Sequence, residues 1–106
     1  MDFTGKTAIS TGAASGMGLL FAQNWVELGG NVVLCDVNEQ ALNEKVEEIN
    51  FKGKGKAIGI VCDVRDYNQV INARDKAVEE FGSIDVMVNF AGGTAVRMQN
   101  VNREKH

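Results

Sequence analysis

Three closely spaced glycines near the N-terminus restrict the fold more than any other feature of the chain. They lie in the segment Thr11-Gly12-Ala13-Ala14-Ser15-Gly16-Met17-Gly18, between an apolar run at 6–10 and a helix-like segment at 17–28. At such a junction, glycines allow a tight turn and a close approach of the backbone to a phosphate. The free amide groups and the positive dipole at the start of the helix also favour an anion. An ordinary flexible turn is the alternative interpretation of the spacing alone.

Strand-like and helix-like patterns alternate along the rest of the chain. Short apolar runs predict strands at 6–10, 31–36, 57–63 and 84–89. Amphipathic segments predict helices at 17–28, 38–50 and 66–81. This alternation predicts an α/β fold, namely a Rossmann-type doubly wound parallel sheet with the strand order 3-2-1-4. In that order the fourth strand is an unpaired edge of the sheet.

Local signals add detail to two of the helices. The first helix is predicted to bury one face, formed by Met17, Leu20, Phe21, Trp25 and Leu28. Asn38 is a suitable N-cap for the second helix. The third helix opens on the spacing Asp66-x-x-Gln69, which predicts a capping box.

The composition argues against several classes of function. The 11 basic and 14 acidic residues give a net charge of −3 without a basic cluster, so nucleic acid is not an expected partner. No apolar stretch approaches the ~20 residues that span a membrane, and the N-terminus lacks the pattern of a secretory signal. Two cysteines, Cys35 and Cys62, fit a reducing, cytoplasmic location. With a single histidine, His106, no metal site is predicted.

Asp36 ends the second predicted strand, 18 positions after Gly18. An acidic residue about 20 positions after a glycine loop can bind the adenosine ribose hydroxyls of NAD. Its charge would repel the 2′-phosphate of NADP, and no Arg or Lys stands near it in the sequence. The alternative role is to cap the following helix, but Asn38 can do that. We therefore predict that Asp36 selects NAD.

The sequence Cys-Asp-Val at 35–37 recurs at 62–64. Both aspartates thus end parallel strands, at the sheet edge where open α/β sheets bind ligands. Asp63 can accept a hydrogen bond from an adenine amino group while Val64 packs on the ring. It can equally cap the turn that leads to Asp66, and the residues alone leave both roles open. The two cysteines are expected to be small buried hydrophobic residues.

Taken together, these residues resemble the short-chain dehydrogenases/reductases. The resemblance rests on five sets of residues, which are Thr11-Gly12-x-x-x-Gly16-x-Gly18, Asp36, Asp63-Val64, Phe81-Gly82-x-Ile84-Asp85 and Asn89-x-Ala91-Gly92. It covers about residues 3–93. Residues 1–93 are accordingly predicted to form the dinucleotide-binding half of a Rossmann fold. Residues 94–106 are predicted to be a loop or tail that leads toward a catalytic half.

The resemblance implies a set of cofactor-binding residues. They are Gly12, Ser15, Gly16, Met17, Gly18, Asp36, Asp63, Val64, Asn89, Phe90, Ala91 and Gly92. Ser15 stands where NADP-preferring relatives often carry a basic residue, which again favours NAD. Phe90 replaces the second Asn of the family's Asn-Asn-Ala-Gly segment, so only its backbone carbonyl is expected to serve the cofactor.

The resemblance also implies an activity, an NAD-dependent hydride transfer between the nicotinamide and an alcohol or ketone. The family's catalytic residues are a Ser, a Tyr and a Lys four residues after that Tyr. Here the single tyrosine is Tyr67, and Ile71 follows four residues later. No catalytic residue is therefore predicted in this chain, which we expect to be an inactive portion of a longer enzyme. The full enzyme is expected to be a homodimer or homotetramer.

Two other functions fit parts of the pattern. A non-catalytic NAD-binding module or sensor would need the glycine loop and Asp36 and nothing downstream. A methyltransferase-like nucleoside binder would use an acidic ribose ligand too, but it would leave the match at Asn89-x-Ala91-Gly92 to coincidence.

Overall fold

The computed structural model describes residues 2–90, 96–97 and 101–102. Its helices are α1 (Gly16–Glu27), α2 (Glu39–Lys52) and α3 (Tyr67–Phe81). Its strands are β1 (Thr7–Thr11), β2 (Asn31–Asp36), β3 (Ala57–Val61), β4 (Ser83–Ile84), β5 (Val86–Asn89), β6 (Val96–Arg97) and β7 (Val101–Asn102). None of the helices in this part of the chain is long and apolar enough to cross a membrane.

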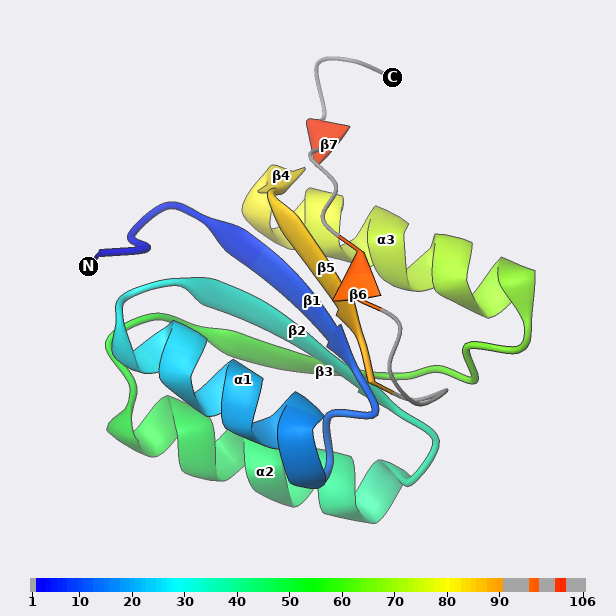
Figure 1. Ribbon diagram of the computed structural model, residues 1–106, viewed down its shortest axis with the longest axis horizontal. Coiled ribbons are helices and arrows are strands. Elements are labelled where there is room, and N and C mark those ends of the chain that lie inside the picture. The colour runs from blue at the N-terminus through cyan, green and yellow to red at the C-terminus, as the bar shows by residue number, and fades with distance from the viewer. Residues whose placement is uncertain (1, 91–95, 98–100, 103–106) are drawn as a thin grey trace.

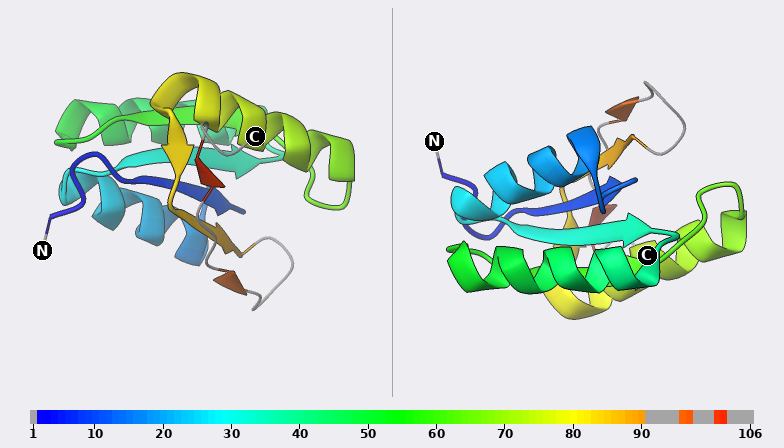
Figure 2. Two further views of the ribbon diagram at one scale, coloured as in Figure 1. Left: turned by 90° about the horizontal axis from the view of Figure 1, so that it is seen from above. Right: turned by 90° about the horizontal axis from the view of Figure 1, so that it is seen from below.

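The main sheet has the strand order β3-β2-β1-β5-β6. Its first four strands are parallel, and Figure 2 shows β1 and β2 side by side and pointing the same way. Helices α1 and α2 lie on one side of the sheet and α3 on the other (Figure 1). The predicted fold class, a Rossmann-type parallel sheet, is confirmed.

The two faces of the sheet bury separate apolar cores, as the alternation of side chains along a strand requires. On the face of α1 and α2, Leu34 packs with Val26 and Leu42. On the face of α3, Val33 and Ile9 pack with small residues of the helix such as Ala73 and Ala77. Strand β2 is buried on both faces, which explains its continuous apolar sequence.

The predicted buried face of α1 is wrong in part. Trp25 is buried, but Met17 is 62% exposed and Leu20 is 49% exposed. The helix instead buries Gly18, Ala22 and Val26. These residues recur every four positions and are smaller than the ones they displace, so the helix axis can approach the sheet closely. Close packing of the helix against the sheet outweighs full burial of Met17 and Leu20.

The last predicted strand, 84–89, is divided in two. Asp85 interrupts it because its backbone amide donates to the Thr7 carbonyl while its carboxylate accepts the Thr7 amide at 2.8 Å. The segment before this break, β4, pairs antiparallel with β7, and the segment after it, β5, pairs with β1.

The expected unpaired edge needs correction, and two short strands lie within the segment 94–106 that is predicted to be a loop or tail. Strand β6, two residues long, pairs antiparallel with β5 and is the edge strand of the sheet on that side. The polar segment after residue 93 therefore contributes two short strands, β6 and β7. Backbone hydrogen bonds need no apolar side chains, and this explains why the hydrophobic pattern did not reveal them.

The helix caps follow the sequence signals with one difference. The Asn38 side chain accepts the Ala41 amide at 3.1 Å, as an N-cap should. Asp66 caps α3 by accepting the Asn68 amide at 3.0 Å. The Gln69 side chain, however, accepts the amide of Asp63 at 2.8 Å and not that of Asp66, so the predicted capping box is incomplete.

We expect Leu34→Ala to lower the free energy of unfolding by about 2–5 kcal/mol, because it removes a fully buried side chain and leaves a cavity. Phe51→Ala is the control, since Phe51 is 89% exposed and its truncation should cost less than about 0.5 kcal/mol. Urea unfolding of both variants measures the difference. Equal losses would contradict the burial described for β2.

Candidate functional site

The loop between β1 and α1 turns sharply and then presents free amides. Gly12 and Gly16 have φ values of 62° and 59°, the left-handed region that favours glycine. Ser15 is the N-cap of α1 in extended conformation, and its side chain makes no capping hydrogen bond. The first turn of α1 contains no acidic residue. The first amides of a helix have no intrahelical partner, so this end can receive an anion.

Gly18 is the point where α1 and the end of β1 are in closest contact. A Cβ atom at this position would overlap the Gly12 carbonyl and would lie 2.9 Å from the Thr11 carbonyl oxygen. The buried Ser10 hydroxyl donates to the Gly18 carbonyl at 3.0 Å and fixes the same contact from the strand side. The helix can therefore direct its N-terminus at the loop only because residue 18 has no side chain.

Asp36 lies at the carboxyl end of β2 and is held there by backbone amides. Its Oδ2 accepts the Ala14 amide at 3.0 Å, and its Oδ1 accepts the Asn38 amide at 3.0 Å. Both carboxylate oxygens thus have a fixed position and a remaining lone pair. The first bond also links the glycine loop to β2, as does the bond from the Ala13 amide to the Cys35 carbonyl at 3.0 Å.

Two adjoining hollows lie along the carboxyl ends of the strands, and Gly12 and Asp36 line both. The acidic hollow, about 410 Å³, is lined by Gly12, Asp36, Val37, Cys62, Asp63, Val64 and Arg65. The glycine-loop hollow, about 350 Å³, is lined by Gly12, Ser15, Gly16, Met17, Gly18, Asp36 and Phe90. Each volume is within the range of small-molecule sites. Of the twelve residues predicted from the sequence, nine line one or both hollows.

Arg65 is the residue of this region that sequence reasoning missed. Its Nε lies 3.0 Å from Asp63 Oδ1 and its Nη2 lies 2.8 Å from Asp63 Oδ2, a two-point ion pair. No basic residue is near Asp36 in the sequence, but Arg65 lines the same hollow as Asp36. Arg65 lies far from Asp36 in sequence, but parallel strands bring their carboxyl ends to one edge. Its position two residues after Asp63 was the available signal.

The ion pair also sets the charge state of Asp63. Hydrogen bonds from the Arg65 side chain and backbone lower the pKa of this carboxyl to about 2. Asp63 therefore stays ionised as a hydrogen-bond acceptor. Its backbone carbonyl accepts the Asp66 amide at 2.9 Å, so the residue also takes part in the turn into α3. The geometry is compatible with both roles that the sequence left open.

The predicted residues after β5 are described in part. Asn89 ends β5 and lines neither hollow, and its side-chain oxygen accepts the Thr11 hydroxyl at 2.6 Å. Phe90 lines the glycine-loop hollow and its ring lies 6.5 Å from that of Phe21, centroid to centroid. Ala91 and Gly92 lie outside the described residues. Asn89 thus ties the ends of β1 and β5 together.

Both cysteines are free and buried, as expected. A hydrogen bond with Cys62, together with burial, raises the pKa of the Cys35 thiol well above its usual value. The same hydrogen bond lowers the pKa of Cys62, which lines the acidic hollow. Cys35 is therefore a neutral thiol of the core, and Cys62 lines the acidic hollow.

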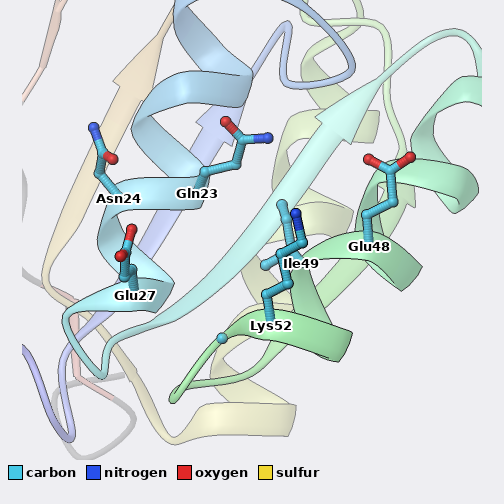
Figure 3. A pocket seen from close by; sticks show the side chains of 7 residues that line it. Gln23, Asn24, Glu27, Glu48, Ile49 and Lys52 are labelled. Carbon is cyan, nitrogen blue, oxygen red and sulfur yellow. The ribbon is translucent and has the colours of Figure 1, made fainter.

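A further hollow lies between α1 and α2, away from the glycine loop. Figure 3 shows its lining, which includes Gln23, Asn24 and Glu27 from α1 and Glu48, Ile49 and Lys52 from α2. These residues belong to the last turns of both helices, near the amino ends of the strands. Ligands of open α/β sheets bind at the opposite edge, so this hollow is not part of the candidate site.

A parallel sheet in which a glycine turn leads from β1 into a helix N-terminus, with an aspartate at the end of β2, defines a Rossmann-type α/β protein. Comparison with known proteins identifies the family within this class. The family model described as "short chain dehydrogenase" matches residues 6–105. The chain belongs to the short-chain dehydrogenase family.

Relatives within the family differ in substrate and cofactor. The 7alpha-hydroxysteroid dehydrogenase of Escherichia coli (strain K12) is 38% identical over 89 residues, which are 84% of this chain and 34% of that protein. A crystal structure of a short-chain dehydrogenase/reductase from Burkholderia phymatum in complex with NAD has 39% identity and a TM-score of 0.77, covering 82% of this chain and 31% of that one.

The chain is also similar in fold to a protein whose structure contains NADPH. The L-sorbose reductase from Gluconobacter frateurii, complexed with NADPH and L-sorbose, has a TM-score of 0.81 and 28% identity, covering 89% of this chain and 36% of that one. The chain spans about a third of the length of these three proteins. Because both nicotinamide cofactors occur among such relatives, the family alone does not decide between NAD and NADP.

We expect Gly18→Ala to lower the free energy of unfolding by about 1–3 kcal/mol, because the new methyl group must push α1 away from rigid backbone. Met17→Ala, one position earlier on an exposed side chain, should change it by less than about 0.5 kcal/mol. Thermal unfolding without cofactor compares the two variants. A Gly18→Ala protein as stable as the wild type would contradict the close contact.

We expect the stability that Asp63 contributes to be complete above its ordinary pKa of 3.8 and to be lost as the pH falls to about 2. The sign follows from a folded-state pKa that lies below the unfolded one. Carboxyl carbon NMR measures this pKa directly. In Arg65→Ala it should return toward 3.8, and a value that stayed near 2 would show that Arg65 is not its cause.

Proposed function

We propose that this chain forms the NAD(H)-binding part of an oxidoreductase that moves a hydride between the nicotinamide and an alcohol or ketone substrate. The observation that carries the proposal is Asp36. Its carboxylate stands where the acidic hollow and the glycine-loop hollow meet, and two backbone amides orient it. A dinucleotide laid along both hollows has its adenosine ribose at this junction.

The glycine-loop hollow suits the diphosphate. The free amides at the start of α1 can donate to phosphate oxygens, and the helix dipole favours their charge. Gly16 and Gly18 keep the backbone accessible, and the uncommitted Ser15 hydroxyl can donate as well. Without an acidic residue in the first turn of α1, nothing in that turn opposes an anion.

The ribose contact supports NAD over NADP. Each Asp36 oxygen already accepts one amide and can accept one more hydrogen bond, so the pair matches the two hydroxyls of an unmodified ribose. A 2′-phosphate would bring like charge against this carboxylate, which is costly. Ser15 adds to this preference because it offers no positive charge to such a phosphate.

The remaining predicted residues complete the cofactor site in this proposal. Asp63 and Val64 belong to the adenine end, and Phe90, Ala91 and Gly92 belong to the nicotinamide end, next to Asn89. We further propose that the active protein works in the cytoplasm as a homodimer or homotetramer. The proposed substrate class draws on relatives named for a hydroxysteroid and for L-sorbose.

A non-catalytic NAD-binding module is the second candidate, and the tyrosine pattern favours it. The chain's one tyrosine, Tyr67, is 75% exposed and lacks a lysine four residues later, so this chain does not supply the proton-transfer group that the resemblance implies. The intact mass of the protein, together with NADH oxidation by a ketone, separates the two candidates. A mass near 11.5 kDa with NADH binding and no turnover would support the module.

We expect Asp36→Ala to reduce the preference for NAD over NADP by at least about tenfold, which corresponds to about 1.4 kcal/mol. Removal of the carboxylate takes away both the ribose acceptor and the repulsion of a phosphate. Isothermal titration calorimetry with each cofactor measures the ratio of the two dissociation constants. Asp75→Ala, which removes the same charge from the exposed face of α3, is the control. An unchanged ratio in Asp36→Ala would refute the ribose assignment.

A further inference from the structure

Arg65 has no role in the cofactor site implied by the family resemblance, yet it lines the acidic hollow. It is 87% exposed, so packing against the protein does not hold its guanidinium in place. The Asp63 carboxylate holds it, through Nε at 3.0 Å and Nη2 at 2.8 Å, and the Arg65 backbone amide donates to the same carboxylate at 3.0 Å. The side chain is therefore oriented before any ligand arrives.

The charges that line the acidic hollow argue against Arg65 as a ligand of the 2′-phosphate of NADP. Asp36, Asp63 and Arg65 carry −1, −1 and +1, so their formal sum is −1. Asp63 already neutralises the guanidinium, and Asp36 is fixed by two backbone amides and cannot turn away. A net negative hollow with its one arginine engaged is a poor site for the 2′-phosphate of NADP.

The shape and polarity of the hollow indicate what the arginine is suited for. A guanidinium is planar and weakly hydrated, and it stacks well on flat π-systems. The two-point bond to Asp63 fixes the plane of the group. Val37, 64% exposed, and Val64 line the same hollow and offer apolar surface. A flat heteroaromatic base fits between such groups better than a sugar or a phosphate does.

We propose that Arg65 is a nucleobase-binding residue, which packs the face of its guanidinium on the adenine of the dinucleotide while Asp63 holds it in position. This inference rests on the proposed function, because it assumes that a dinucleotide occupies the two hollows. It adds a specificity determinant that acts on the base and is indifferent to the ribose 2′ position. The affinities for NAD and NADP should therefore depend equally on Arg65, whereas the ratio of the two affinities should depend on Asp36 and not on Arg65.

The test uses substitutions of Arg65 that separate its charge from its planar shape. Calorimetry on the whole protein measures the binding of NAD and NADP to each variant. Arg65→Ala should weaken both cofactors about 5- to 30-fold, the loss of one stacking contact. Arg65→Tyr keeps a flat face without charge and should stay within about threefold of the wild type. Arg65→Lys keeps the charge without the plane and should resemble Arg65→Ala.

Arg74→Ala is the matched control, because Arg74 forms an exposed ion pair with its neighbour Asp75 on α3 and lines neither hollow. It should leave both affinities unchanged. Thermal unfolding should differ little among the Arg65 variants, since the Arg65 side chain is 87% exposed.

Three results would overturn the inference. In the first, Arg65→Ala binds NAD like the wild type. In the second, Arg65→Lys keeps the affinity and Arg65→Tyr loses it, which would show that the charge acts and not the plane. In the third, only NADP is affected, which would identify a phosphate contact. Wild-type protein that bound neither cofactor would instead refute the proposed function, and this inference with it.

Discussion

The contact between Gly18 and the backbone of Gly12 and Thr11 is the constraint on which the rest of the structure depends. It lets α1 lie so close to the end of β1 that the helix begins inside the turn, with its free amides at the edge of the sheet. The same close approach selects small residues for the buried face of α1 and leaves Leu20 partly in solvent. The packing of α1 and the position of its free amides therefore share one physical cause, which is the absence of a side chain at position 18.

Charge organises the other half of the site. Asp36 ends β2 and Asp63 lies two residues after the end of the neighbouring parallel strand β3, so two carboxylates line one hollow. The two carboxylates differ in the groups that hold them. Backbone amides hold Asp36 and leave its charge available, whereas Arg65 neutralises Asp63 and lowers its pKa to about 2. One acidic group can then recognise a ribose, while its neighbour orients a planar cation.

The sequence predicted the strands and helices of the fold well, because their signals are local. Apolar runs, glycine turns and the Asn38 cap each act within a few residues, and β2 was predicted with its observed bounds. The two departures in strand pairing involve distant partners. The division between β4 and β5 depends on Asp85 meeting Thr7, and the short strand β6 forms because β5 offers a free edge. Pairing of this kind leaves no periodic pattern in the chain.

The residues of the candidate site also differ in how far they could be predicted from local sequence patterns. The glycine loop and Asp36 could be predicted from spacing, since the β1–α1–β2 unit places them together in any right-handed crossover. The part played by Arg65 could not, because nearly thirty residues separate it from Asp36 and its meaning comes from the hollow that both line. Residue spacing was sufficient to predict that the glycine loop and Asp36 lie together at one edge of the sheet. The charge balance of that site, and the face of α1 that supports it, arose from packing between elements far apart in the chain.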